Sequence, residues 1–262
     1  MTQHVTSTAG DQVGFDRYGD GPAVVFVAGA GPFRAVDPLT TRTAQLVAEQ
    51  GLTAVVYDRL GRGDSPADGV LDLDREVSAL GAVIDVAGVP AVLVGHSSGC
   101  AIALAAADVE QPVAGLLLWE APLAGSLEEV AAWSGEFERR LDAEDYVGAT
   151  EQYMRDMPPE WLAAMKAAPE FEVLARASRS QRADGQAMVR ATELLETGAL
   201  RELSVPVLAT YGTSTFPEMP VAAQRVAEVA TRGRVEEVPG EGHSWDAEAM
   251  AARIVQFVRH EL

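Results

Sequence analysis

Residues 95–99 read Gly-His-Ser-Ser-Gly, which places one serine between two glycines in the pattern Gly-x-Ser-x-Gly. A short apolar run at 91–94 precedes the motif, and an alanine-rich helical pattern at 99–107 follows it. A strand that turns sharply into a helix holds the central serine on a strained backbone, so that its hydroxyl projects above the sheet. The spacing therefore predicts a nucleophile elbow with Ser97 as the nucleophile.

A serine nucleophile needs a base that accepts its proton, and imidazole has a pKa near the working pH. The chain has four histidines: His4, His96, His243 and His260. His243 stands in the glycine-rich stretch after the last expected strand, where it is free to approach the serine. His96 is inside the elbow and cannot fold back on Ser97, so we expect it to have a structural role. The other two lie near the ends of the chain.

Composition limits the classes of partner. The net charge is -19, and this average field repels nucleic acid and anionic membrane surfaces. A neutral small molecule is therefore the expected partner. No apolar run reaches the length of a membrane span and the first residues lack a signal-peptide pattern, so we expect a cytoplasmic protein. The single cysteine, Cys100, cannot form an internal disulfide, and the histidines show no metal-ligand spacing, so we expect neither a metal nor another cofactor.

The order of apolar patterns predicts an α/β fold. Buried strands are expected at 23–27, 53–57, 91–94, 113–119, 205–211 and 234–238, after a hairpin formed by 3–8 and 13–18. Helical patterns alternate with them at 36–50, 73–87, 221–230 and 246–259. The expected architecture is a mainly parallel sheet with helices on both faces, whose sites lie at the carboxyl ends of the strands.

The alternation stops between the fourth of these strands and the next, where only helical patterns occur. We therefore expect a core of residues 1–122 and 204–262 and an inserted helical lid of residues 123–203. Aromatic side chains are concentrated in this lid, and four of them are expected to line the substrate pocket: Trp133, Phe137, Tyr153 and Trp161. Aromatic residues at helical spacing are also typical of ordinary packing, so both interpretations stay open.

Three motifs resemble those of the α/β-hydrolase fold family, and the resemblance covers nearly the whole chain. They are the elbow at 95–99, the Asp-x-x-Gly-x-Gly-x-Ser loop at 58–65 and the Gly-x-Gly-His segment at 240–243. The resemblance implies that His243 is the base. It also implies an oxyanion hole formed by the backbone N–H of Ser98 and, by motif position, of Ala30. The family commonly has His-Gly at the positions of Ala28 and Gly29, but a backbone donor does not depend on that histidine.

The acid of the triad is where the sequence departs most from this family. Its members usually carry an aspartate at the position of Thr215, and a threonine cannot hold an imidazolium by charge. A minority, including haloalkane dehalogenases and zearalenone lactone hydrolases, place a glutamate after the earlier strand, and Trp119-Glu120-Ala121-Pro122 is similar to that arrangement. Glu120 is therefore the expected acid. Its carboxylate could also simply face water, and Glu218 is a weaker alternative.

These observations predict a serine hydrolase that cleaves a neutral ester or lactone through an acyl-enzyme. The similarity to the zearalenone-hydrolase pattern favours a lactone. Dehalogenation is disfavoured because it needs a carboxylate at position 97. Two alternatives stay open: a receptor-like protein that keeps the hydrolase pocket but hardly turns over, and a cofactor-free perhydrolase that uses peroxide as acyl acceptor. The oligomeric state is also open, and a homodimer is one option.

Overall fold

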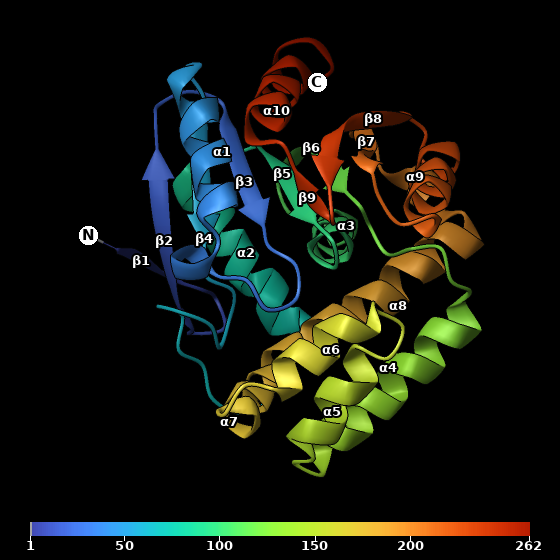
Figure 1. Ribbon diagram of the computed structural model, residues 1–262. Helices are drawn as coiled ribbons and strands as arrows, with labels where there is room; N and C mark the ends of the chain where they lie inside the picture. The colour runs from blue at the N-terminus through green and yellow to red at the C-terminus, as the bar shows by residue number, and fades with distance from the viewer. Residues whose placement is uncertain (1) are drawn as a thin grey trace.

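A computed structural model describes residues 2–262, and its strands form one sheet in the order β1-β2-β4-β3-β5-β6-β7-β8-β9. The pairs β1/β2, β2/β4 and β8/β9 are antiparallel, and every pair from β4 to β8 is parallel. The strands are β1 (Gln3–Thr6), β2 (Gln12–Tyr18), β3 (Ala23–Val27), β4 (Thr53–Tyr57), β5 (Ala91–His96), β6 (Val113–Trp119), β7 (Val207–Ser214), β8 (Gly233–Glu241) and β9 (Ser244–Trp245). This mainly parallel sheet confirms the expected α/β class (Figure 1).

Helices cover both faces of the sheet. α1 (Pro38–Glu49) and α10 (Ala247–His260) contribute to the core on one face. The core on the other face contains side chains of α2 (Leu73–Ala87), α3 (Gly99–Asp108) and α9 (Glu218–Val229). The loops at the ends of the strands therefore extend from a sheet whose two faces are both packed against helices.

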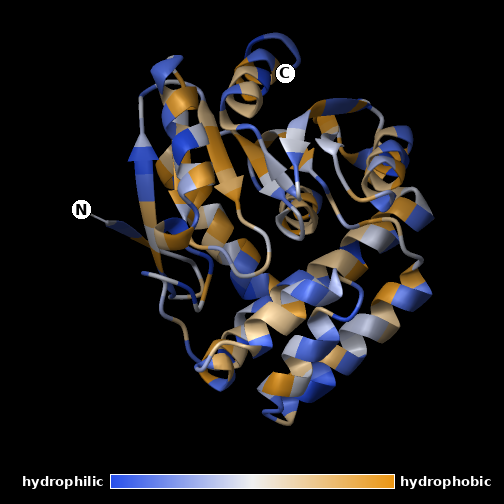
Figure 2. Cartoon of the chain, in the orientation of Figure 1, coloured by the Kyte–Doolittle hydropathy of each residue, from blue (hydrophilic) through white to orange (hydrophobic). Residues whose placement is uncertain are grey.

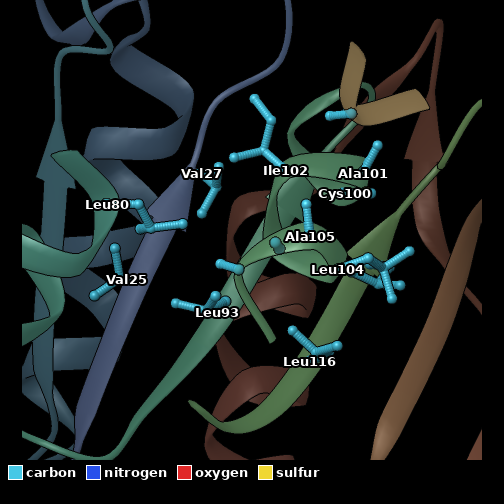
Figure 3. Packing of buried hydrophobic residues seen from close by; sticks show 14 of the residues in the cluster. Val25, Val27, Leu80, Leu93, Cys100, Ala101, Ile102, Leu104, Ala105 and Leu116 are labelled. Carbon is cyan, nitrogen blue, oxygen red and sulfur yellow. The ribbon is translucent and has the colours of Figure 1, made fainter. Parts of the chain in front are cut away.

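Alternate residues of the central strands enter the two cores, because successive side chains of a strand point to opposite faces. Val24 and Phe26 of β3 belong to the core with α1 and α10, whereas Val25 and Val27 belong to the core with α2 and α3. Figure 3 shows the small side chains of α3, such as Ala105, beside Leu93 and Leu116 of the sheet. Small residues let this helix, which begins at the elbow, lie close to the strands.

The segment between β6 and β7 consists of helices and short turns (Figure 1). Its elements are α4 (Leu127–Asp142), α5 (Tyr146–Tyr153), α6 (Pro159–Lys166), α7 (Phe171–Ala175) and α8 (Arg182–Thr197), with 3-10 turns at Arg176–Gln181 and Ala199–Glu202; a further 3-10 turn, Arg34–Val36, precedes α1. In Figure 1 α4 to α8 lie together below the sheet. Ala187 and Ala191 of α8 are buried in the same core as α3, so α8 joins this segment to the sheet. The division into a core and a lid stays a prediction.

The distribution of polarity follows these layers. Figure 2 shows β3 of the central sheet largely in the apolar colour, the arrowhead half of β2 in the polar colour, and bands of both polarities along the helices. None of the helices in residues 2–262 is both long enough and apolar enough to cross a membrane.

Candidate active site

The turn between β5 and α3 holds Ser97 in an uncommon backbone conformation. Its φ angle is +54°, in the left-handed region that residues other than glycine rarely adopt. The backbone N–H of Ser97 donates to the carbonyl oxygen of Trp119 at 2.9 Å, which fixes the turn to β6. A Cβ atom at Gly99 would lie 2.2 Å from the carbonyl oxygen of Val27, so only glycine allows α3 to start this close to β3. The geometry is that of a strained strand-to-helix turn.

The loop after β3, residues 28–32, lies against this turn. A Cβ atom at Gly29 would stand 3.0 Å from the Cβ of Ser97 and 2.9 Å from the carbonyl oxygen of His96, so the loop backbone approaches the serine closely. Within residues 2–262, neither the backbone N–H of Ala30 nor that of Ser98 donates a hydrogen bond. Two free donors therefore flank the position that the sequence assigns to the oxyanion hole, where their roles stay a prediction.

His243 lies in the tight turn between β8 and β9, with a φ angle of +70°. Two ring N–H groups hold its carbonyl oxygen: Nε2 of His96 donates to it at 3.0 Å and Nε1 of Trp119 at 3.2 Å. The ring centroids of His96 and His243 are 5.0 Å apart. Because His96 precedes Ser97 in the chain, these contacts place His243 beside the elbow. They hold the backbone of His243, and the orientation of its imidazole ring depends on a separate contact at Nδ1.

Glu120 follows β6 directly, and its side chain is 1% exposed. Its Oε2 lies 2.5 Å from Nδ1 of His243, and its Oε1 accepts from the backbone N–H of Gly212 at 3.0 Å. Burial opposes ionisation of this carboxyl group, but the bonds to His243 and Gly212, together with the nearby Thr215 hydroxyl, hold the pKa of Glu120 below its usual value. A carboxylate that is ionised and fixed in this place can stabilise an imidazolium on His243.

The other candidate acid lies elsewhere in the site region. Glu218 is exposed at the first turn of α9. Within residues 2–262, the carboxylate that hydrogen-bonds Nδ1 of His243 is that of Glu120. Thr215 stands near Glu120 with its hydroxyl buried, so the usual acid position of the resembled family lies close in space to Glu120. Residues 2–262 contain no cluster of three His, Cys, Asp or Glu side chains arranged to hold a metal ion.

His96 is expected to make the stability of the protein depend on pH. Burial, and to a smaller extent the neighbouring His243, lower the pKa of His96 to about 4 from an ordinary value of 6.5. Between these two pH values the unfolded chain binds more protons on this ring than the folded chain, so the free energy of unfolding decreases as the pH falls through this window. The decrease is expected to be on the order of 3 kcal/mol.

A His96→Gln variant keeps a side-chain donor but cannot titrate. Urea unfolding at pH 4.5 and 6.5 should show a smaller pH dependence for this variant than for the parent protein. His260→Gln is the matched control, because His260 is exposed on the last turn of α10. Equal pH dependence of the free energy of unfolding in the parent and in His96→Gln would contradict the role of His96 in this pH dependence.

The four aromatic residues expected in the pocket occupy two places. Trp133, Phe137 and Tyr153 form a cluster with ring centroids 5.2 to 6.0 Å apart, and Ala30 packs against it. The cluster thus touches the loop of residues 28–32, although Phe137 itself is fully buried. The pocket assignments of all four residues stay predictions.

Trp161 is the fourth, and it is 38% exposed on α6. Its ring lies 5.9 Å from that of Phe216, which in turn lies 6.1 Å from the imidazole of His243. Phe216 was not anticipated from the sequence, since a single aromatic residue in the loop after β7 belongs to no pattern. Trp161 and Phe216 thus form a row of aromatic rings from α6 to His243.

These places predict different effects of truncation. Trp161→Ala should change the ratio of kcat/KM between large and small substrates by about tenfold if the predicted pocket role of Trp161 holds, because its ring is exposed and little of it packs in the protein core. Its free energy of unfolding should change little. Phe137→Ala should instead lower the free energy of unfolding by about 3–5 kcal/mol, because it empties a buried site. Urea unfolding measures the free energy of unfolding, and a series of esters of graded size measures the kcat/KM ratio. If the two variants changed both quantities equally, the distinction between a pocket residue and a core residue would be contradicted.

Comparison with known proteins agrees with this fold. The sequence profile described as the Alpha/beta hydrolase family matches residues 24–257. The crystal structure of an alpha/beta hydrolase from Sphaerobacter thermophilus DSM 20745 is 28% identical, with a TM-score of 0.81 over 98% of this chain and 100% of that one. A thermophilic esterase from Thermogutta terrifontis is 21% identical (TM-score 0.70; 99% and 97% covered), and the enol-lactonase from Burkholderia xenovorans LB400 is 17% identical (TM-score 0.66; 98% and 99% covered). No curated protein sequence matches. By its profile match and its fold, this chain belongs to the alpha/beta hydrolase family.

Proposed function

We propose that the protein is a serine hydrolase that cleaves a neutral ester or lactone through an acyl-enzyme. The observation that carries this proposal is the 2.5 Å contact between Nδ1 of His243 and Glu120, beside a serine with a φ angle of +54°. A nucleophile, a base and an acid in this order form the constellation that activates a serine hydroxyl. The family match supports a hydrolase, and the pairing of these particular residues supports serine-based acyl transfer.

In the proposed reaction the Ser97 oxygen attacks the substrate carbonyl carbon while its proton passes to Nε2 of His243. The imidazolium is stabilised by Glu120 through Nδ1, and the carbonyl oxygen gains a negative charge that the N–H groups of Ser98 and Ala30 stabilise. Collapse of this intermediate expels the alcohol, which takes the proton from His243. Water then attacks the acyl-enzyme by the same route and releases the acid. With a lactone the alcohol stays on the acyl chain, so the product is a hydroxy acid.

A neutral lactone is the substrate class that we favour. The net charge of -19 disfavours anionic substrates, because the average field repels them. Placement of the acid as a glutamate directly after β6 is similar to the zearalenone lactone hydrolases, and this similarity supports the lactone. The enol-lactonase neighbour shares the fold at 17% identity, which is compatible with this subclass and does not by itself select it.

The test has two stages. Mixing the protein with a p-nitrophenyl ester should release a burst of one chromophore per active site, followed by steady turnover. A panel of lactones, each paired with an open-chain ester of the same size, should then give the higher kcat/KM for the lactone. Absence of both burst and turnover would favour the receptor-like alternative, and a much faster reaction with hydrogen peroxide than with water would favour a perhydrolase.

A further inference from the structure

Four buried charged side chains form a cluster between the sheet and helix α8. Arg59 and Arg62 come from the loop after β4, Glu76 from α2 and Asp184 from α8, and each is at most 5% exposed. Arg59 donates to both carboxylate oxygens of Asp184, at 2.6 and 3.0 Å, and to Glu76 at 3.0 Å. Arg62 approaches Asp184 to 3.3 Å. Two cations and two anions balance each other, so each charge is compensated inside the protein.

The two arginines also hold the oxyanion loop. Arg62 Nη1 donates to the carbonyl oxygen of Gly29 at 2.6 Å, and Arg59 Nη1 donates to that of Ala28 at 3.2 Å. The carbonyl group of Gly29 and the N–H of Ala30 belong to the same planar trans peptide, in which the two bonds point in opposite directions. Because the carbonyl is fixed toward the ion cluster, the N–H of Ala30 points away from it.

The second expected donor residue is tied to the same carboxylate. The hydroxyl of Ser98 donates to Oδ1 of Asp184 at 2.6 Å, and both groups are buried. Asp184 therefore reaches Ser98 directly and the Gly29–Ala30 peptide through Arg59 and Arg62. We propose that Asp184 is a positioning residue that fixes both backbone donors of the oxyanion hole from helix α8. This inference rests on the proposed function, because it assigns a role in stabilising the oxyanion.

The charge of Asp184 is essential to this arrangement. Burial alone would favour the neutral acid, but Arg59 and Arg62 outweigh it and lower the pKa of the carboxyl group below its usual value. Only the carboxylate can accept from both arginines and from Ser98 at once.

The test compares Asp184→Asn with a control on the same helix. In Asp184→Asn, kcat for a p-nitrophenyl ester should fall at least about tenfold, with KM within threefold, because donors that are misaligned act mainly on the transition state. The control is Arg182→Gln, which removes the ion pairs of α8 with Glu138 and Asp142 on α4. Its kcat should stay within twofold of the parent. Ser98→Ala, which keeps all backbone groups and the arginine pairs, should show a smaller loss of kcat.

A second readout does not depend on activity. The amide order parameter of Ala30, measured by 15N relaxation, should be about 0.85 in the parent and Arg182→Gln but below about 0.6 in Asp184→Asn. An unchanged order parameter would overturn the inference, whether or not the protein hydrolyses esters. Absence of ester turnover in the parent would instead overturn the proposed function. If Asp184→Asn does not fold, Asp184→Glu replaces it, because it keeps the charge and both arginines but displaces the carboxylate by one methylene group; kcat and the order parameter of Ala30 should fall in the same direction.

Discussion

Replacement of Ser97 by alanine is expected to lower kcat by about four orders of magnitude or more. The variant loses the oxygen that forms the acyl-enzyme. Ser98, the neighbouring serine, already donates its hydroxyl to Asp184 at 2.6 Å and is 2% exposed. The burst of chromophore should disappear together with the steady rate.

Covalent labelling provides the structural part of this test. A serine-directed phosphonate should modify the parent protein once, on the peptide that contains Ser97, and should leave Ser97→Ala unmodified. Ser98→Ala is the matched control, because it removes the adjacent hydroxyl and should still be labelled at Ser97. Within residues 2–262 the hydroxyl of Ser97 makes no hydrogen bond, so its removal should hardly change the melting temperature. Labelling at Ser98, or activity in Ser97→Ala, would contradict the assignment.

The sheet could be predicted because its central strands are buried on both faces. Such strands need continuous apolar sequence, and residues 23–27, 53–57 and 113–119 have it. The C-terminal edge of the sheet was predicted less completely. The strand expected at 234–238 is β8, which extends over Gly233–Glu241 and forms a hairpin with β9. This edge is half exposed and polar, and its pairing depends on tertiary contacts such as Trp245 with Trp119.

Helix ends were predicted to within a few residues, and local capping explains the difference. The first helix was expected from residue 36 but α1 begins at Pro38. The side chain of Asp37 accepts from the backbone N–H of Thr40 at 3.0 Å, and proline fits the first helical position because it has no N–H to satisfy. The residues before this cap form a separate 3-10 turn, Arg34–Val36. An expected apolar face does not reveal such a boundary.

The site divides into residues that motifs reveal and residues that they do not. Ser97 and His243 stand in glycine-rich motifs because sharp turns need special backbone angles. Asp184 has no such signal, and Arg59 stands at an unspecified position of the loop motif at 58–65. Neither side chain is therefore marked as buried, since single charged residues in a sequence usually lie on a solvated surface. Their burial depends on pairing between segments 125 positions apart, which only the folded chain shows. The residues that surround the motifs are therefore revealed by the folded structure and not by the sequence.

Replacement of Glu120 by glutamine is expected to lower kcat by about a thousandfold or more, with little change in KM. The amide keeps the shape of the side chain but loses the charge that stabilises an imidazolium on His243. It can also donate toward Nδ1 instead of accepting from it, which favours the wrong tautomer of the base. Because Glu120 is 1% exposed, water cannot replace its carboxylate.

Glu218→Gln is the matched control for this experiment. It makes the same chemical change at the other acid that the sequence offers, but on an exposed side chain at the start of α9. Its kcat should stay within about twofold of the parent, since exposed charges are screened by solvent. A large loss in Glu218→Gln, or near-parent activity in Glu120→Gln, would contradict the role of Glu120 and weaken the analogy with the lactone hydrolases.

A double variant tests whether charge or position is what the base requires. Thr215 occupies the position at which most of the family carries its aspartate, and its buried hydroxyl lies near Glu120. Glu120→Gln/Thr215→Asp moves the carboxylate from the end of β6 to the loop after β7 while keeping one negative charge beside His243. We expect its kcat to be at least about tenfold higher than that of Glu120→Gln, because an ionised carboxylate can again orient the imidazole. Thr215→Asn in the same background adds a side chain of the same size without charge and should recover nothing. Equal activity of the two double variants would show that the charge near His243 is not what turnover requires.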